Sequence, residues 1–253
     1  MTRLNIALGA TRDWLIYSAT TVASILCNAY PDDSYHFYII SDRFNTKEKN
    51  HFYSLNKIKE SNFHFLKIDN SEFDGAIHDW LGVSSSYRLK LSSLVNESKI
   101  LYLDSDIIAL DNINELYSYD ISDYYLAAVE DKCSSFMKQR VKLNIDQTFF
   151  NGGMQLINLD NFRKDNLEEI IFEKLRASKF YTDQDVINDV CRDKILSLPL
   201  KYNIVPFGRY TLREQERDEA FNNPVLLHFA TKPWKAPDTW KSDEWYEFRA
   251  LVS

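Results

Sequence analysis

The sequence predicts an α/β fold, a sheet with helices on its faces. Apolar extended runs alternate with helix-like segments over the first two thirds of the chain, which is typical of such sheets. The composition is that of an ordinary globular protein, with 45% hydrophobic residues. The 253 residues are enough for one large core, and we find no repeat, low-complexity tract or flexible linker. We therefore expect a single domain.

The individual elements follow from local patterns. Strands are expected at 4–9, 35–40, 63–68, 99–103, 124–129, 153–157 and 194–198. Helices are expected at 14–29, from Thr46 as cap to about residue 59, and at 86–95, 166–178 and 183–192. The stretch around Trp80 is less regular. Five of the six prolines fall in the last quarter, which we expect to wrap as irregular chain.

Glycine is scarce and excludes two kinds of nucleotide site. The chain has 6 glycines, where average usage predicts about 18. No segment fits the glycine-rich loops of dinucleotide-binding or P-loop proteins. The net charge of −7 argues against general affinity for nucleic acids, which requires a basic face.

The cysteines and the apolar runs bear on where in the cell the protein is expected. Cys27, Cys133 and Cys191 are odd in number and far apart, so they form neither a disulfide framework nor a zinc pattern. We expect buried free thiols in a reducing environment. There is no secretory signal and no fully apolar run long enough for a transmembrane helix. A cytoplasmic location is therefore expected, with peripheral contact at the inner face of the membrane left open.

The most informative segment follows the apolar run 99–103. Asp104 and Asp106 are separated by one residue, so on an extended chain they project to the same face. The carboxyl ends of strands are where open α/β sheets bind ligands. Two carboxylates this close need a cation, and Mg²⁺ or Mn²⁺ with a diphosphate fits them. The alternative is a turn in which both side chains bind backbone donors. A phosphatase is disfavoured because position 108 is Ile where its pattern requires Thr.

Two further segments carry polar groups suited to a sugar. The stretch 149–154 reads F-F-N-G-G-M, and paired glycines in a chain so poor in glycine indicate a sharp turn or close approach to a ligand. Asn151 would then offer its amide to a polyhydroxy ligand. Asp183, Gln184 and Asp185 open the predicted helix 183–192. There, one acid could cap the helix and the other favour its dipole, or the group could grip sugar hydroxyls.

The fourth segment, 226–234, reads L-L-H-F-A-T-K-P-W. His228 can bind a metal through one ring nitrogen, and Lys232 is a compact cation suited to a phosphate. A lone histidine beside apolar residues is more often part of a core, so both interpretations of His228 stay open on this pattern alone.

These segments, in this order, resemble the retaining glycosyltransferases of family 8, the group of glycogenin and the bacterial lipooligosaccharide α-galactosyltransferases. The resemblance covers nearly the whole chain. It rests on Y-R-L-K-L at 87–91, L-Y-L-D-S-D at 101–106, F-N-G-G at 150–153, D-Q-D at 183–185 and H-F-A-T-K-P-W at 228–234. Each motif is weak alone, but together and in order they are specific.

The resemblance implies a GT-A fold, a Rossmann-like mixed sheet with helices on both faces. Residues 1–110 would form the nucleotide-binding half, and 111–253 the half that binds acceptor and donor sugar. The implied reaction is a Mn²⁺-dependent transfer of a hexose, glucose or galactose favoured, from a UDP-sugar to a saccharide or glycoconjugate with retention of configuration. Mg²⁺ is the alternative metal. Bacterial lipopolysaccharide or capsule synthesis is the implied setting.

The resemblance also implies roles for individual residues. The metal ligands would be Asp104, Asp106 and His228, with Gln184, Asp183 and Asp185 as the catalytic group. An amide is a poor nucleophile, so front-face attack by the acceptor is favoured over a nucleophilic role of Gln184. Asp185 is the fallback nucleophile. Donor and nucleotide contacts would come from Ala10, Thr11, Asp13, Trp14, Arg88, Asp104, Ser105, Asn151, Gly152 and Lys232.

Two departures from the family pattern support a second hypothesis, a non-catalytic sugar-nucleotide-binding protein on the same fold. Thr11 stands where the family often has an acid that meets the uracil. Ala230 and Thr231 stand between His228 and Lys232, where the family usually has a glycine.

Overall fold

The computed structural model describes residues 2–77, 82–131, 138–139, 141–142, 147–178, 181–206 and 214–252. The predictions for Trp80 and Cys133 lie outside these residues. Of the described cysteines, Cys191 is buried as predicted, whereas Cys27 is exposed, which corrects the expectation of a buried thiol there. Cys27 is the last residue of helix α1, where the helix leaves the core.

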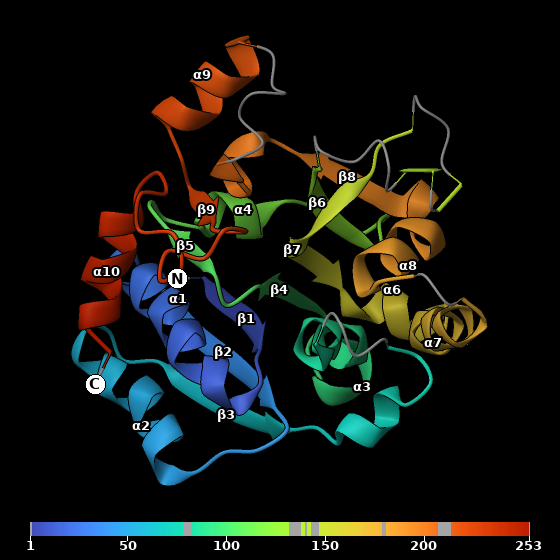
Figure 1. Ribbon diagram of the computed structural model, residues 1–253, viewed down its shortest axis with the longest axis horizontal. Helices are drawn as coiled ribbons and strands as arrows, with labels where there is room; N and C mark the ends of the chain where they lie inside the picture. The colour runs from blue at the N-terminus through green and yellow to red at the C-terminus, as the bar shows by residue number, and fades with distance from the viewer. Residues whose placement is uncertain are drawn as a thin grey trace.

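A seven-stranded mixed sheet forms the centre of the molecule, in the order β3-β2-β1-β4-β7-β6-β8 (Figure 1). Strand β7 runs antiparallel to both of its neighbours, and the other pairings are parallel. A second sheet pairs β5 with β9 antiparallel. The strands are β1 (Arg3–Gly9), β2 (Ser34–Ser41), β3 (Asn62–Lys67), β4 (Lys99–Leu103), β5 (Ile107–Ala109), β6 (Leu126–Glu130), β7 (Phe150–Asn158), β8 (Ile195–Leu198) and β9 (Leu226–His228).

Helices cover both faces of the large sheet, which confirms the predicted fold class. Alternate side chains of β1 enter opposite cores: Ile6 and Leu8 pack with helix α1, and Ala7 packs on the other face with α6, α7 and α8. A third core lies around β5 and β9 and includes Trp245 of α10. The α-helices are α1 (Leu15–Cys27), α2 (Thr46–Tyr53), α3 (Leu91–Leu94), α4 (Asn114–Ser118), α6 (Leu159–Lys164), α7 (Leu167–Ala177), α8 (Asp183–Val190), α9 (Glu214–Asn222) and α10 (Ser242–Ala250).

Short 3-10 helices connect several of these elements. They are η1 (Arg12–Trp14), η2 (Ser54–Lys57), η3 (Asn70–Phe73), η5 (Val83–Lys90), η6 (Arg192–Lys194) and η7 (Leu200–Tyr202). The predicted helix 86–95 is thus mostly the end of η5, continued by α3. Among the described residues no helix has the length and apolar character needed to cross a membrane.

Two local predictions were wrong, and a third choice between alternatives is decided by the structure. Asn45 caps helix α2 in place of Thr46, because its side chain accepts from Glu48 N while the Glu48 side chain accepts from Asn45 N, a capping box. Of the two alternatives for the paired glycines, the sharp turn is excluded because both lie inside strand β7, where a Cβ on Gly153 would meet the ring of His228. The last quarter is not wholly irregular, since it contains α9, β9 and α10. Apolar residues of these elements, such as Trp245, pack into the core around β5 and β9.

Candidate active site

Asp104 and Asp106 lie in the turn between β4 and β5. The amide of Asp104 donates to Gly153 O of the neighbouring strand β7 at 2.8 Å, which anchors the turn at the carboxyl end of β4. The Asp104 side chain is 24% exposed and that of Asp106 only 4%. The two acids thus lie at the carboxyl end of strand β4, as the sequence predicted.

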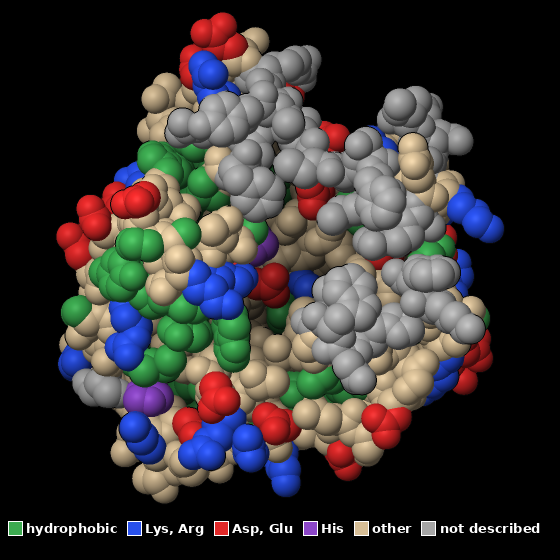
Figure 2. Space-filling model, in the orientation of Figure 1, with side chains coloured by type: hydrophobic (Ala, Val, Ile, Leu, Met, Phe, Trp, Pro, Cys, Tyr) green, Lys and Arg blue, Asp and Glu red, His purple; other side chains and the backbone are tan. Residues whose placement is uncertain are grey.

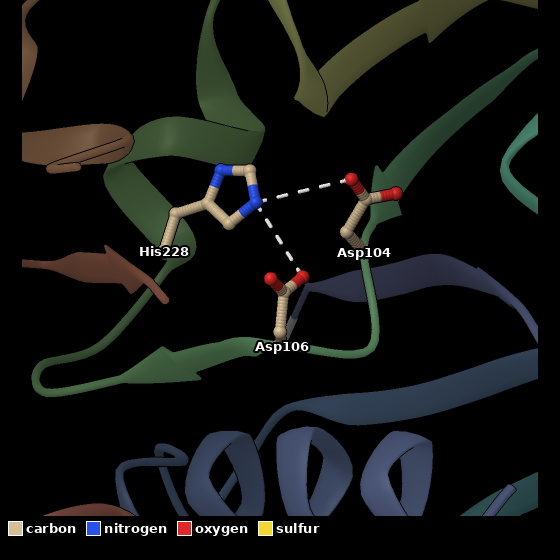
Figure 3. Close-up of side chains that lie close together, drawn as sticks. All are labelled: Asp104, Asp106 and His228. Atoms are coloured by element: carbon tan, nitrogen blue, oxygen red, sulfur yellow. Dashed lines mark ion pairs between the residues drawn. The ribbon is translucent and has the colours of Figure 1, made fainter. Parts of the chain in front are cut away.

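His228 joins this pair from the other end of the chain. The pairing of β5 with β9 places His228 opposite Ile107, and Phe229 N donates to Asp106 O at 2.8 Å. The Nε2 atom of His228 lies 3.4 Å from Asp106 Oδ1 and 3.9 Å from Asp104 Oδ2, as the dashed lines in Figure 3 show. One ligand atom from each residue lies within 4.8 Å of the other two. Two carboxylates and an imidazole form a donor set that Mn²⁺ and Mg²⁺ accept.

The charged side chains of this cluster shift one another's pKa values. Burial raises the pKa of Asp106, but His228 and Lys232 outweigh it and lower that pKa to about 2. Lys232 forms an ion pair with Asp106 Oδ2. Burial raises the pKa of Asp104, with Asp106 adding to the effect and Arg88 opposing it. Burial alone would lower the pKa of His228, but the neighbouring carboxylates raise it. The site thus favours an anionic Asp106 beside positive charge.

Arg88 connects the acidic pair to helix α8. It lies in η5, and its side chain is 4% exposed. Its Nε donates to Asp183 Oδ2 at 2.8 Å, Nη2 forms an ion pair with the same oxygen, and Nη1 lies 3.5 Å from Asp104 Oδ1. Nη1 also donates to Gly152 O. The Asp183 and Asp104 carboxylates raise the pKa of Arg88 against the effect of burial. Arg88 and Asp183 are thus brought together beside Asp104, although far apart in sequence.

Gln184 and Asn151 lie beside the same strand. Gln184 Oε1 accepts from Gly152 N at 2.7 Å. The side-chain amides of Gln184 and Asn151 both donate to Asp131 Oδ2, at 3.4 and 3.3 Å. We did not single out Asp131 from the sequence. It follows the apolar strand β6, just as Asp104 follows β4, and that signal would have identified it.

Asp185 does not share this arrangement. It is fully buried, and its Oδ2 accepts from both the backbone N and the Oγ1 of Thr182 at 2.8 Å. Together with the Asp185 N–Thr182 Oγ1 bond these contacts form a capping box on α8. The structure therefore favours the capping interpretation of Asp185 over its role as a fallback nucleophile.

The predicted nucleotide contacts occupy the adjoining edge. Trp14 is half-buried, with its ring edge-on to Trp234 at 5.5 Å and Lys232 Nζ 5.7 Å from its centre. Asp13 is exposed, Thr11 half-exposed and Ala10 buried.

Ser105 has a structural contact in this region. It is buried, and its hydroxyl lies 2.7 Å from that of Ser18 on α1, which ties the turn between the two acids to that helix. Figure 2 shows that the surface is hollowed near its centre, where acidic, basic and histidine side chains meet.

Comparison with known proteins gives consistent matches. The family model described as glycosyl transferase family 8 matches residues 5–238. The lipopolysaccharide 1,2-glucosyltransferase of Escherichia coli is 29% identical over 91% of this chain and 73% of its own length. The lipopolysaccharide 1,3-galactosyltransferase of Salmonella typhimurium is 25% identical over 92% of this chain and 73% of its own length.

Other relatives are longer than this chain. The match spans 66% of the length of a Haemophilus influenzae relative and 34% of the Streptococcus pneumoniae glycosyltransferase GlyA.

A solved structure confirms the architecture. The galactosyltransferase LgtC, crystallised with donor and acceptor sugar analogues, superposes with a TM-score of 0.84 at 20% identity and covers 100% of this chain and 96% of its own. The likeness shows a GT-A fold. Because the family model matches almost the entire sequence, the chain belongs to glycosyl transferase family 8.

Proposed function

We propose that this protein is a metal-dependent retaining glycosyltransferase. It moves a hexose, glucose or galactose, from a UDP-sugar to a hydroxyl of a glycan or glycoconjugate in bacterial surface polysaccharide synthesis. The observation that carries this proposal is the meeting of Asp104, Asp106 and His228 at the carboxyl end of β4. Two relatives named as lipopolysaccharide glucosyl- and galactosyltransferases support the hexose and the acceptor class.

The three clustered side chains would hold Mn²⁺ or, alternatively, Mg²⁺. When bound, the ion would supply positive charge beside the diphosphate that leaves the sugar. Lys232 adds a second positive charge next to Asp106. To contact a diphosphate, the Lys232 ammonium exchanges its carboxylate partner for a phosphate oxygen, which keeps its charge compensated.

The donor sugar would lie against Arg88, Asp183, Asn151 and Gln184. No strong nucleophile is available among them, because Gln184 is a neutral amide and Asp183 forms an ion pair with Arg88. We therefore favour front-face attack. The acceptor oxygen bonds to the anomeric carbon as the carbon–phosphate oxygen bond breaks, and the acceptor proton passes to the leaving phosphate.

The test is the metal-dependent release of UDP. The protein is incubated with Mn²⁺ and, separately, UDP-glucose, UDP-galactose and UDP-N-acetylglucosamine. We expect slow hydrolysis of one donor, faster release with an oligosaccharide acceptor, and none after chelation. Asp104→Asn should abolish release, whereas Asp123→Asn, an exposed acid, should match the wild type. Absence of metal-dependent UDP binding in calorimetry contradicts the proposal.

The same experiment separates the second hypothesis. The residues Thr11, Ala230 and Thr231, which depart from the family pattern, favour a sugar-nucleotide-binding protein without turnover. In that case Asp104→Asn removes nucleotide binding, yet the wild type turns over no donor with any acceptor. The retained acidic pair and His228 are the reason to rank the enzyme first.

A further inference from the structure

A relay of hydrogen bonds lies behind His228, on the side away from the acidic pair. His228 Nδ1 is 3.1 Å from Asn203 Oδ1. Asn203 Nδ2 donates to Asn151 Oδ1 at 2.9 Å, and Gly153 N donates to the same oxygen at 2.9 Å. Asn203 is 2% exposed and His228 7%, so the bond between them is shielded from water. No local sequence pattern marks Asn203 as a functional residue.

The backbone holds Asn203 beside His228. Asn203 follows η7, and the next residue, Ile204, forms a bridge with Leu227 of β9. In that bridge His228 N donates to Ile204 O at 2.8 Å, and Ile204 N donates to Leu226 O at 3.0 Å. The distance between the asparagine and the imidazole is therefore set by main-chain bonds on both sides.

The direction of the relay follows from one backbone group. The N–H of Gly153 can only donate, so the Asn151 atom that it faces is the carbonyl oxygen. That oxygen can bind Asn203 only through the Nδ2 group of Asn203, which turns Oδ1 of Asn203 toward the imidazole. An amide oxygen only accepts, so Nδ1 of His228 must carry a hydrogen.

We propose that Asn203 is a positioning residue that holds Nδ1–H of His228 and so directs Nε2 at Asp104 and Asp106. The inference rests on the proposed function in that Nε2 is taken as a metal ligand. Histidines that bind metals usually donate their second N–H to a fixed acceptor, which sets the tautomer and the ring orientation. Asn203 provides that acceptor from a segment outside the recognised motifs.

The first test is spectroscopic and uses the metal-free protein. In protein labelled with ¹⁵N-histidine, long-range ¹H–¹⁵N spectra distinguish protonated from bare ring nitrogens, and a His228→Gln variant assigns the signals. The spectra are recorded at alkaline pH, where the imidazole carries a single ring hydrogen despite the neighbouring carboxylates, and we expect that hydrogen on Nδ1 in the wild type. Asn203→Leu should lose this preference, and Asn203→Asp, which keeps an acceptor oxygen, should restore it. A bare Nδ1 in the wild type overturns the proposal, whether or not any variant folds.

Asn188 provides a matched control. It lies in α8 and is 3% exposed, and its amide accepts from Phe150 N and donates to Phe150 O, so it is an equally buried asparagine whose side chain binds strand β7. Asn188→Leu should lower the melting temperature, as Asn203→Leu does, but leave the His228 signals unchanged. If Asn188→Leu alters them equally, the effect of Asn203 is general destabilisation and the proposal fails.

The second test measures Mn²⁺ affinity by calorimetry. We expect Asn203→Leu to weaken binding by about 10- to 100-fold, and Asn203→Asp to recover most of the loss. Asn188→Leu should bind like the wild type. Wild-type affinity in Asn203→Leu overturns the positioning role. If the wild type binds no Mn²⁺ at all, the proposed function fails, and the spectra still decide whether Asn203 sets the tautomer.

Discussion

Substituting Gly153 with alanine tests the close contact between strand β7 and the ring of His228. A Cβ atom on Gly153 would lie 2.3 Å from His228 Cε1 and 2.7 Å from Nδ1. Positive φ occurs at Gly75 and Gly82 but not at Gly153, so the backbone itself accepts alanine. The added methyl group must therefore push the imidazole by about 1 Å to reach an ordinary contact.

We expect two measurable effects of Gly153→Ala. Overpacking of this size costs about 1–3 kcal/mol, or about 2–12 °C in melting temperature for a chain of this length. The displaced ring moves Nε2 away from the acidic pair, so Mn²⁺ affinity should fall by at least about tenfold, the scale of a disturbed ligand orientation. Thermal unfolding and calorimetric titration with Mn²⁺ measure the two effects.

The stability cost should largely disappear when the ring is absent. In a His228→Ala background only Asn151 Oδ1, 3.1 Å from the new Cβ atom, remains close. Gly153→Ala should then be nearly neutral, because alanine also restricts the unfolded chain by about 0.4–1 kcal/mol. Gly75→Ala is the control: its φ of +71° costs about 1 kcal/mol in strain, with no atom within 4 Å, and should leave Mn²⁺ binding intact. An equal cost of Gly153→Ala in both backgrounds refutes this reasoning.

Three further predictions concern stability. Arg88→Met leaves Asp183 buried without its cation and should cost about 3–5 kcal/mol in urea denaturation; adding Asp183→Asn should recover part of this loss, and additive losses would contradict the pairing. Burial raises the pKa of Glu48, but the hydrogen bond from Arg12 and that from the α2 N-cap backbone outweigh it and lower the pKa. This carboxylate thus stabilises the fold above its unfolded pKa and ceases to do so as pH falls through the lower folded value. Glu48→Gln should therefore be less stable than the wild type at neutral pH, and the difference should close below about pH 4 in urea titrations. The halves 1–110 and 111–253 share one sheet, so calorimetry should show one unfolding transition, and two separate transitions would contradict a single domain.

Much of the fold was predictable because short-range patterns determine it. The strand 99–103 was predicted with the bounds of β4, since its apolar run ends at the first acid. The choice of cap for α2 was not predictable to the residue, because Asn45 and Thr46 are both good caps and only the backbone at Asn45 is extended. The exposed Cys27 was missed for a similar reason, since burial depends on where the helix leaves the core.

The site was predictable only as separate pieces. The spacing of Asp104 and Asp106 indicates a shared face, and that follows from the period of a strand. Position 153 requires a glycine because the ring of His228, from a distant segment of the chain, occupies the space that a side chain would need. Likewise, Asn203 has no local pattern of its own, because its place depends on the bridge of Ile204 with Leu227. Such contacts exist only after both sheets have formed.

The antiparallel direction of β7 explains why these pieces meet at one edge. Strands β1 and β4 run parallel, so Ala10 and Asp104 follow them at the same end of the sheet. Strand β6 is antiparallel to β7 and so runs in the same direction as β4, which places Asp131 at that end too. Because β7 runs the opposite way, its first residues lie there, and Gly153 O accepts from Asp104 N. A parallel strand in this position would have carried Asn151 to the far edge, away from both acids.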